Sequence, residues 1–135
     1  MRIRVKFHGL RLLKKGGAVT RAEVLGWIKE FLGGHDFEGD LEVVFLAVPS
    51  LDHPECRAWG IYRTGRNRVE VALGFPERPR SRLELMLTIA HELDHLLWEF
   101  QKLPWDYAPA YWERKHEIRA FASAEAFAGR RWTRM

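Results

Sequence analysis

Residues 81–102 read SRLELMLTIAHELDHLLWEFQK, and this stretch decides the fold of the chain. Ser81 and Glu84 stand three residues apart, which predicts a capping box at the start of a helix. Behind them, apolar residues recur at helical spacing and are expected to face the core. They are Met86, Ala90, Leu93, Leu97 and Phe100. The sequence therefore predicts a long helix over about residues 82–102.

The same stretch carries His91-Glu92-Leu-Asp-His95. With 3.6 residues per turn, His91 and His95 lie one turn apart on one helix face, so both imidazoles can reach one metal ion. Glu92 lies about 100° further round the helix and flanks that ion. There its carboxylate can take a proton from a metal-bound water, whose pKa zinc lowers to about 7. The pattern thus predicts Zn²⁺ bound by His91 and His95, with Glu92 as general base.

A catalytic zinc needs three protein ligands and one open position. A third helix, predicted over about residues 110–128 and ended by Gly129, offers Glu113, His116 and Glu117. Glu117 is followed at i+3, i+4 and i+7 by Ala-Phe-Ala, and the small alanines allow close approach to the metal helix. Glu117 is therefore the favoured third ligand, while Glu113 and His116 remain alternatives.

The remaining segments indicate an α+β fold. Strands are expected where apolar and polar residues alternate or where β-branched residues gather, at residues 2–8, 41–48, 57–63 and 68–73. Turns are expected at residues 14–17 and 64–67, and Thr20 with Glu23 predicts a capping box for an N-terminal helix that ends at residues 33–34. We expect a mixed, mostly antiparallel sheet of about four strands packed against three helices.

The length and composition fit a single domain over residues 1–135. The chain is 47% hydrophobic and 30% charged, which excludes a disordered polymer. No apolar run approaches the roughly 18 residues that a membrane-spanning helix needs, and no signal peptide is recognisable. The one cysteine, Cys56, cannot form an internal disulfide, so a cytoplasmic protein is expected. Cys56 is expected to be inert, with a reactive thiol or a latent-state metal ligand as alternatives.

The net charge of +4 is mild. The excess of basic residues lies in two arginine clusters. One consists of Arg78, Arg80 and Arg82, and the other, near the C-terminal end, of Arg130, Arg131 and Arg134. Basic clusters can contact nucleic acid, but no recognised binding motif accompanies them. Solvated arginines are therefore the expected interpretation, and we do not expect a nucleic-acid partner.

His91-Glu92-x-x-His95 followed by Glu117-x-x-Ala120 resembles the zincin metallopeptidases of the gluzincin branch. The short chain resembles the minigluzincins, and the Glu-x-x-Ala-Phe-Ala stretch resembles the ImmA/IrrE-like peptidases of bacteria and phages. The resemblance covers about residues 57–128. It implies a zincin-like fold, zinc ligation by His91, His95 and Glu117, and a strand at residues 68–73 along the cleft edge, where an extended peptide can add as a strand. Asp94 departs from the small or apolar residue common at this place in the motif.

The expected function is that of a small zinc-dependent endopeptidase acting on a peptide or protein substrate. The alternative is a zincin-fold protein that binds a metal or a partner without turnover. Candidates to stabilise the oxyanion are Tyr107, Tyr111 and His116. An aromatic cluster could form an apolar specificity pocket or complete the core. Its members are Trp98, Trp105, Tyr107, Tyr111 and Trp112.

Overall fold

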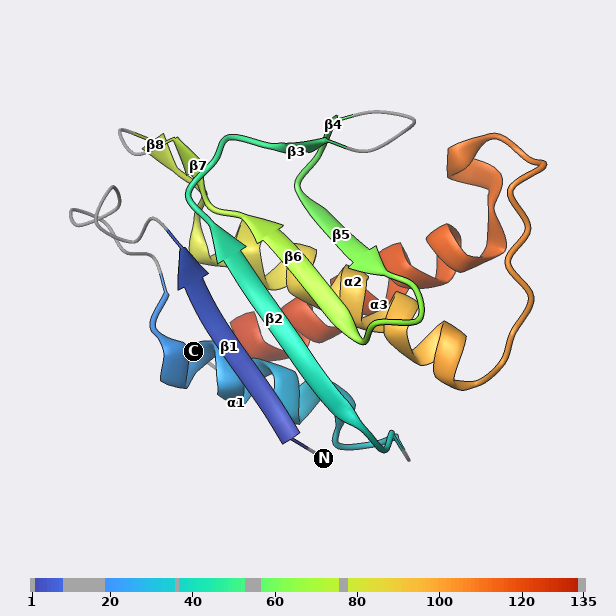
Figure 1. Cartoon of the computed structure of the whole chain (residues 1–135), viewed down its shortest axis with the longest axis horizontal. Coiled ribbons are helices and arrows are strands. Elements are labelled where there is room, and N and C mark those ends of the chain that lie inside the picture. Colours follow the sequence, from blue (N-terminus) through green and yellow to red (C-terminus); the bar gives the residue numbers. More distant parts are fainter. Residues whose placement is uncertain (1, 9–18, 36, 53–56, 76–77, 134–135) are drawn as a thin grey trace.

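Three α-helices cover one face of a four-stranded sheet in the described part of the chain (Figure 1). The computed structural model describes residues 2–8, 19–35, 37–52, 57–75 and 78–133. The expected turn at residues 14–17, Cys56 and Arg134 lie outside the described residues, as do the side chains of Arg78 and Arg131. The helices are α1 (Arg21–Leu32), α2 (Arg82–Phe100) and α3 (Lys115–Thr133). The α+β class is therefore confirmed.

The sheet has the strand order β1-β2-β6-β5, with β1 (Arg2–His8), β2 (Asp40–Leu46), β6 (Arg68–Ala72) and β5 (Gly60–Arg63). The pairs β1–β2 and β2–β6 are parallel, and only the β5–β6 pair of this sheet is antiparallel. The predicted mixed sheet is therefore confirmed, whereas the expected dominance of antiparallel pairing within it is wrong. Helix α1 lies in the connection between β1 and β2, and such a crossover returns the chain in the same direction.

Strand β5 precedes β6 in the sequence but lies outside it, at the edge of the sheet (Figure 1). The hairpin turn between them is at residues 64–67, as predicted, with Gly65 and Asn67 at positive φ. Strand β6 pairs on both sides, with β2 and with β5. The implied position of residues 68–73 at the cleft edge is therefore wrong, because β5 occupies that edge.

Short strands extend beyond the main sheet. β3 (Leu51–Asp52) pairs with β4 (Arg57–Ala58), and β7 (Gly74–Phe75) pairs with β8 (Arg78–Pro79). The predicted strand over residues 57–63 is thus divided into β4 and β5 at Trp59. A small apolar cluster of Leu51, Ile61 and Ala72 joins β3 to the sheet.

Both predicted capping boxes are present. Thr20 and Glu23 begin α1, and Ser81 and Glu84 begin α2, each pair exchanging two hydrogen bonds with backbone N–H groups. The apolar stripe of α2 is buried as predicted except for Phe100, which is 40% exposed and packs edge-on against Phe37. Among the described residues, no helix is long and apolar enough to cross a membrane.

Helix α3 differs from its predicted bounds at both ends. The 3₁₀ turn η2 (Tyr111–Glu113) precedes it, and the extended backbone of Arg114 accepts hydrogen bonds from the N–H groups of Glu117 and Ile118. The predicted end of the helix at Gly129 is wrong, because the helix continues to Thr133. Gly129 is not among the described glycines with positive φ, the conformation that a glycine at a helix end usually adopts. A glycine costs a helix only about 1 kcal/mol relative to alanine, so it does not by itself end one.

Candidate metal centre

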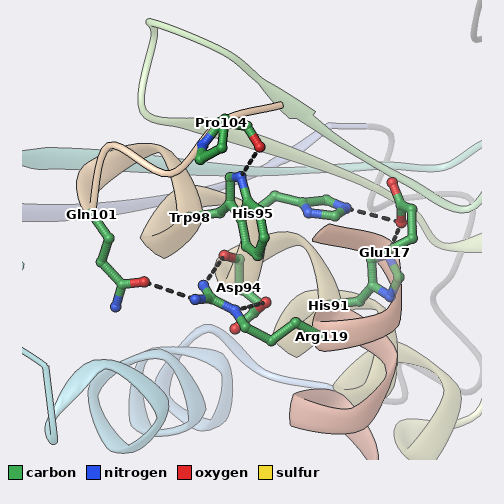
Figure 2. Close-up of polar contacts among 8 residues, drawn as sticks. All are labelled: His91, Asp94, His95, Trp98, Gln101, Pro104, Glu117 and Arg119. Carbon is green, nitrogen blue, oxygen red and sulfur yellow. Dashed lines mark hydrogen bonds and ion pairs between the residues drawn. The ribbon is translucent and has the colours of Figure 1, made fainter. Parts of the chain in front are cut away.

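Two histidines of α2 converge on one carboxylate of α3. Oε1 of Glu117 lies 2.8 Å from Nε2 of His91 and 3.1 Å from Nε2 of His95. Figure 2 shows both imidazoles directed at this carboxylate from the neighbouring helix. All three side chains are buried. The predicted spacing therefore places His91 and His95 on one face, and the structure brings Glu117 to that face.

The approach of α3 depends on its small residues. Ala120 and Ala124, at i+3 and i+7 from Glu117, are fully or almost fully buried. Residues without bulky side chains let two helix backbones come close together. Phe121 lies one turn beyond Glu117 and packs edge-on against the ring of His91, with ring centroids 4.4 Å apart. The alanines thus set the distance between the helices, and Phe121 covers one side of the site.

The two alternative third ligands are placed differently. Glu113 lies in η2 and is exposed, whereas His91 and His95 are buried. His116 is 1% exposed, and its Nε2 lies 3.5 Å from Oε2 of Glu117. Neither ring nitrogen of His116 has a hydrogen-bond partner among the described residues. His116 therefore adjoins the oxygen of Glu117 that does not contact His91 and His95.

Electrostatics couple the carboxylate to the histidines. Burial would raise the pKa of Glu117, but hydrogen bonds from His91 and His95 hold it well below its usual range. Burial would lower the pKa of His95, but its hydrogen bond with Glu117 and the nearby charges of Glu92, Glu117 and Asp94 raise it. The lowered pKa of Glu117 keeps its carboxylate ionised, as a metal ligand must be. The raised pKa of His95 favours its imidazolium form without a metal, so a bound cation would have to displace that proton.

Glu92 lies beside the histidines on the same helix. One ligand atom each from His91, Glu92 and His95 lie within 4.8 Å of one another, and all three residues are buried. This group could hold a metal ion. Ligand atoms around a tetrahedral zinc lie about 3.3 Å apart, given bonds of about 2.0–2.1 Å. The contacts of Glu117 with His91 and His95, at 2.8 and 3.1 Å, are those of hydrogen bonds. Increases of about 0.5 and 0.2 Å would bring them to the separation that suits a metal.

Strand β5 passes directly over Glu92. A Cβ atom added to Gly60 would lie 2.6 Å from Cγ2 of Thr88 and 2.9 Å from Cγ of Glu92. Only a residue without a side chain lets the backbone come this close without displacing its neighbours. Gly60 therefore allows the edge strand to contact the helix at the residue expected to act as base.

Two cavities meet at Glu92. The cavity on the His95 side has a volume of about 460 Å³ and is also lined by Glu117, Tyr107 and His116. The cavity on the His91 side has a volume of about 690 Å³ and a mostly apolar lining. Gly60 and Tyr111 line both. The histidine–carboxylate group therefore lies between a polar and an apolar recess.

The aromatic residues of the predicted cluster lie in different parts of the site. Trp98, Trp105 and Tyr107 surround the ring of His116, with centroid distances of 5.9, 4.8 and 5.2 Å. Trp112 instead lines the apolar cavity, together with Trp59 and Phe121. The aromatic cluster predicted from the sequence included neither Trp59 nor Phe121. The three residues predicted as candidates to stabilise an oxyanion, Tyr107, Tyr111 and His116, all line the polar cavity. Their position therefore does not distinguish between them.

Arg119 is a further residue of the centre that sequence reasoning missed. Its Nε donates to Oδ2 of Asp94 at 3.0 Å, next to the two histidines (Figure 2). Asp94 is 3% exposed, so its carboxylate is not an ordinary surface group. The only sequence signal was the unusual acidic residue inside the His-Glu-x-x-His pattern, which indicates that a buried cation must lie nearby.

Comparisons with known proteins found no matching family model, no matching curated protein and no matching solved structure. The zincin resemblance and the roles it implies for His91, Glu92, His95 and Glu117 therefore stay predictions, based on the motifs and on the geometry described above.

Proposed function

We propose that this protein is a small zinc-dependent endopeptidase. The observation that carries the proposal is the convergence of His91, His95 and Glu117 beside Glu92, directly beneath an edge strand. Two imidazoles and one carboxylate are a donor set that suits zinc and leaves one position open. When bound, zinc would polarise the substrate carbonyl and make water acidic enough to react near neutral pH.

Glu92 is the proposed general base. Its carboxylate takes a proton from the water that attacks the peptide carbonyl, so that a carbon–oxygen bond forms. The same proton then passes to the leaving nitrogen as the carbon–nitrogen bond breaks. Burial of Glu92 beside two cavities supports this role, since a base must reach substrate while being shielded from bulk water.

The outer edge of β5, with which no other described strand pairs, is the proposed peptide-binding site. The N–H of Ala72 in β6 donates to the carbonyl of Trp59, so Trp59 directs its carbonyl towards β6. Along a strand of an antiparallel pair, every second residue directs its N–H and C=O groups at the partner strand, and the residues between direct theirs away from it. Because Trp59 faces β6, Gly60 faces outward and so does Tyr62, two residues further on. An extended substrate can pair with these groups and pass over Glu92.

The apolar cavity is the proposed site for a large apolar substrate side chain. Trp59 and Trp112 are 59% and 72% exposed, and with Leu87 and Phe121 they line a cavity that begins at His91 and Glu92. Exposed aromatic side chains around a concave apolar surface are typical of binding sites. Side chains of a peptide paired with β5 would enter this cavity next to the bond that is cleaved.

Hydrolysis of a quenched-peptide library, with and without a chelator, tests the proposal. We expect chelator-sensitive cleavage, and a fall of about 10²- to 10⁴-fold for Glu92→Gln with zinc still bound. Equal activity with and without chelator would contradict the metal mechanism. Stoichiometric zinc without any cleavage would instead favour the alternative, a metal- or partner-binding protein without turnover.

A further inference from the structure

Arg119 of α3 contacts two residues of α2 and the residue that caps its C-terminal end, Gln101, all along one side of that helix (Figure 2). Its Nε and Nη2 donate to Oδ2 and the backbone oxygen of Asp94, at 3.0 and 3.3 Å. Its Nη1 donates to Oε1 of Gln101 at 2.8 Å, and its Cζ lies 4.8 Å from the ring centroid of Trp98. Positions 94, 98 and 101 are i, i+4 and i+7, so one guanidinium spans about two turns of the metal helix.

The carboxylate of Asp94 is buried, and it needs the contact with Arg119 to remain so. A carboxylate removed from water without a partner is strongly disfavoured, and its ion pair with Arg119 offsets that penalty. A buried ion pair adds little stability over a well-packed apolar pair, but it restricts how two elements can be aligned. The planar guanidinium is suited to this, because it fixes direction as well as distance.

Glu117 and Arg119 hold α3 from opposite sides. They are two residues apart, which is about 200° around the helix. Between them lies the buried stripe of α3, which comprises His116, Ala120, Ala124 and Phe127. Glu117 contacts His91 and His95 on one flank of this stripe, and Arg119 contacts Asp94 on the other. A contact on each flank fixes both the rotation of α3 about its axis and its position along α2.

The large members of the stripe, His116 and Phe127, lie at its two ends, and the small residues between them contribute little to fixing this position. Ala120 and Ala124 present smooth surfaces with few projections to interlock with α2. A slip of one residue would move the carboxylate of Glu117 by about 1.5 Å along the axis and about 100° around it. Such a slip would remove Glu117 from both histidines.

We propose that Asp94 and Arg119 are positioning residues of the metal centre, which hold α3 in the register that delivers Glu117 to His91 and His95. This inference rests on the proposed function, because it takes Glu117 as a metal ligand. It assigns the acidic residue inside the His-Glu-x-x-His pattern to alignment of the two helices. Neither residue contacts the substrate or the metal in this account.

Zinc affinity, measured by competition with a chromogenic chelator, tests the inference in a set of four proteins. They are the unsubstituted chain, Arg119→Ala, Glu117→Ala and the double variant. We expect Arg119→Ala to weaken zinc binding by about 10- to 100-fold, as is usual for residues that orient ligands. In the Glu117→Ala background, however, the same substitution should change affinity less than about 2-fold, because Arg119 then has no ligand to position.

Arg119→Lys is the conservative variant, and it keeps the charge while losing the forked geometry. It is expected to fold and to bind zinc with an affinity between those of the unsubstituted chain and Arg119→Ala. Arg82→Ala is the matched control, since Arg82 pairs with Glu23 and joins α2 to α1 away from the centre. It should leave zinc affinity unchanged.

Three results would overturn the inference. Unchanged zinc affinity in both Arg119 variants would do so, as would an equal loss from Arg119→Ala with and without Glu117. Failure of the unsubstituted chain to bind zinc would remove the proposed function as well, whereas the first two results would leave it standing. The absorption spectrum of the cobalt-substituted protein gives a second readout: Arg119→Ala should shift it towards that of Glu117→Ala, and Arg82→Ala should not.

Discussion

Oε1 of Glu117 lies 2.8 Å from Nε2 of His91, although 26 residues separate them in the chain. The contact joins two helices whose sequences each carry part of a metal-ligand pattern. His95 contacts the same oxygen, so a single carboxylate atom links both imidazoles. Such convergence of buried donors is what a metal centre requires, and it follows from the phase of α2 and the close approach of α3.

Glu117→Gln keeps the shape of the side chain but removes its charge. We expect zinc affinity to fall by more than the roughly 10- to 100-fold typical of a supporting residue, because an anionic ligand is replaced by a neutral amide. Isothermal titration with zinc measures the change. Glu113→Gln is the matched control, since Glu113 is exposed on η2. Weaker binding in the Glu113 variant together with normal binding in the Glu117 variant would reverse the assignment of the third ligand.

Gly60→Ala places a methyl group against Thr88 and Glu92, at 2.6 and 2.9 Å from their nearest atoms. Either β5 must move outward or Glu92 must shift, so we expect both a loss of turnover and a destabilisation of about 1–3 kcal/mol. Peptidase assays and urea unfolding measure the two effects.

Gly26→Ala serves as the control for that substitution. Gly26 lies in α1, and apart from the adjacent residues and the backbone of its own helix no described atom lies within 4 Å of an added Cβ, so alanine should stabilise the helix by about 0.5–1 kcal/mol. Its turnover should be unchanged. If Gly60→Ala behaved like Gly26→Ala, the close contact between β5 and Glu92 would have no functional importance.

Trp112→Ala removes an exposed wall of the apolar cavity, where Trp112 stacks on Phe121 with centroids 5.4 Å apart. We expect kcat/KM to fall by about 10-fold for peptides with a large apolar residue next to the cleaved bond. Peptides with alanine there should be little affected. Phe100→Ala, at an aromatic residue that lines neither cavity, should affect both substrates alike. Equal losses on the two substrates in Trp112→Ala would exclude this cavity as a specificity pocket.

Low pH should weaken the ion pair between Glu70 of β6 and Arg63 of β5, which joins the two strands. Hydrogen bonds from Arg63 of β5 hold the pKa of Glu70 below its ordinary value of 4.5, against the opposing effect of burial. A carboxyl group whose pKa is lowered by folding stabilises the folded state fully above that ordinary value, and this stabilisation disappears as the pH falls through the lowered pKa.

The free energy of unfolding should therefore decrease below about pH 4.5, and less steeply in Glu70→Gln than in the unsubstituted chain. Urea unfolding at a series of pH values measures the difference. Identical slopes for the two proteins would mean that the ion pair with Arg63 does not contribute to stability in solution.

Much of this centre could be predicted because helix phase is a local property. Spacing of four residues places His91 and His95 together, and the alanines after Glu117 identify the face that approaches α2. The capping residues Ser81 and Glu84 likewise mark the start of α2 from adjacent sequence. In each case the decisive residues lie within one or two turns of each other.

The order of strands was not predictable in the same way. Alternation in residues 57–73 indicates strands but does not say which one lies at the edge, because strand pairing depends on contacts far apart in the chain. The partner of Asp94 was hidden for the same reason, since Arg119 is 25 residues away. The start of α3 at Lys115 depends on Arg114, whose side chain donates to the carbonyls of Pro109 and Tyr107.

The most direct test of the metal centre is an anomalous difference map from crystals of the zinc-loaded protein. We predict one strong peak about 2.0–2.1 Å from Nε2 of His91, Nε2 of His95 and an oxygen of Glu117, with Glu92 beside it but not bound. A peak coordinated without Glu117, or no peak between α2 and α3, would contradict the account.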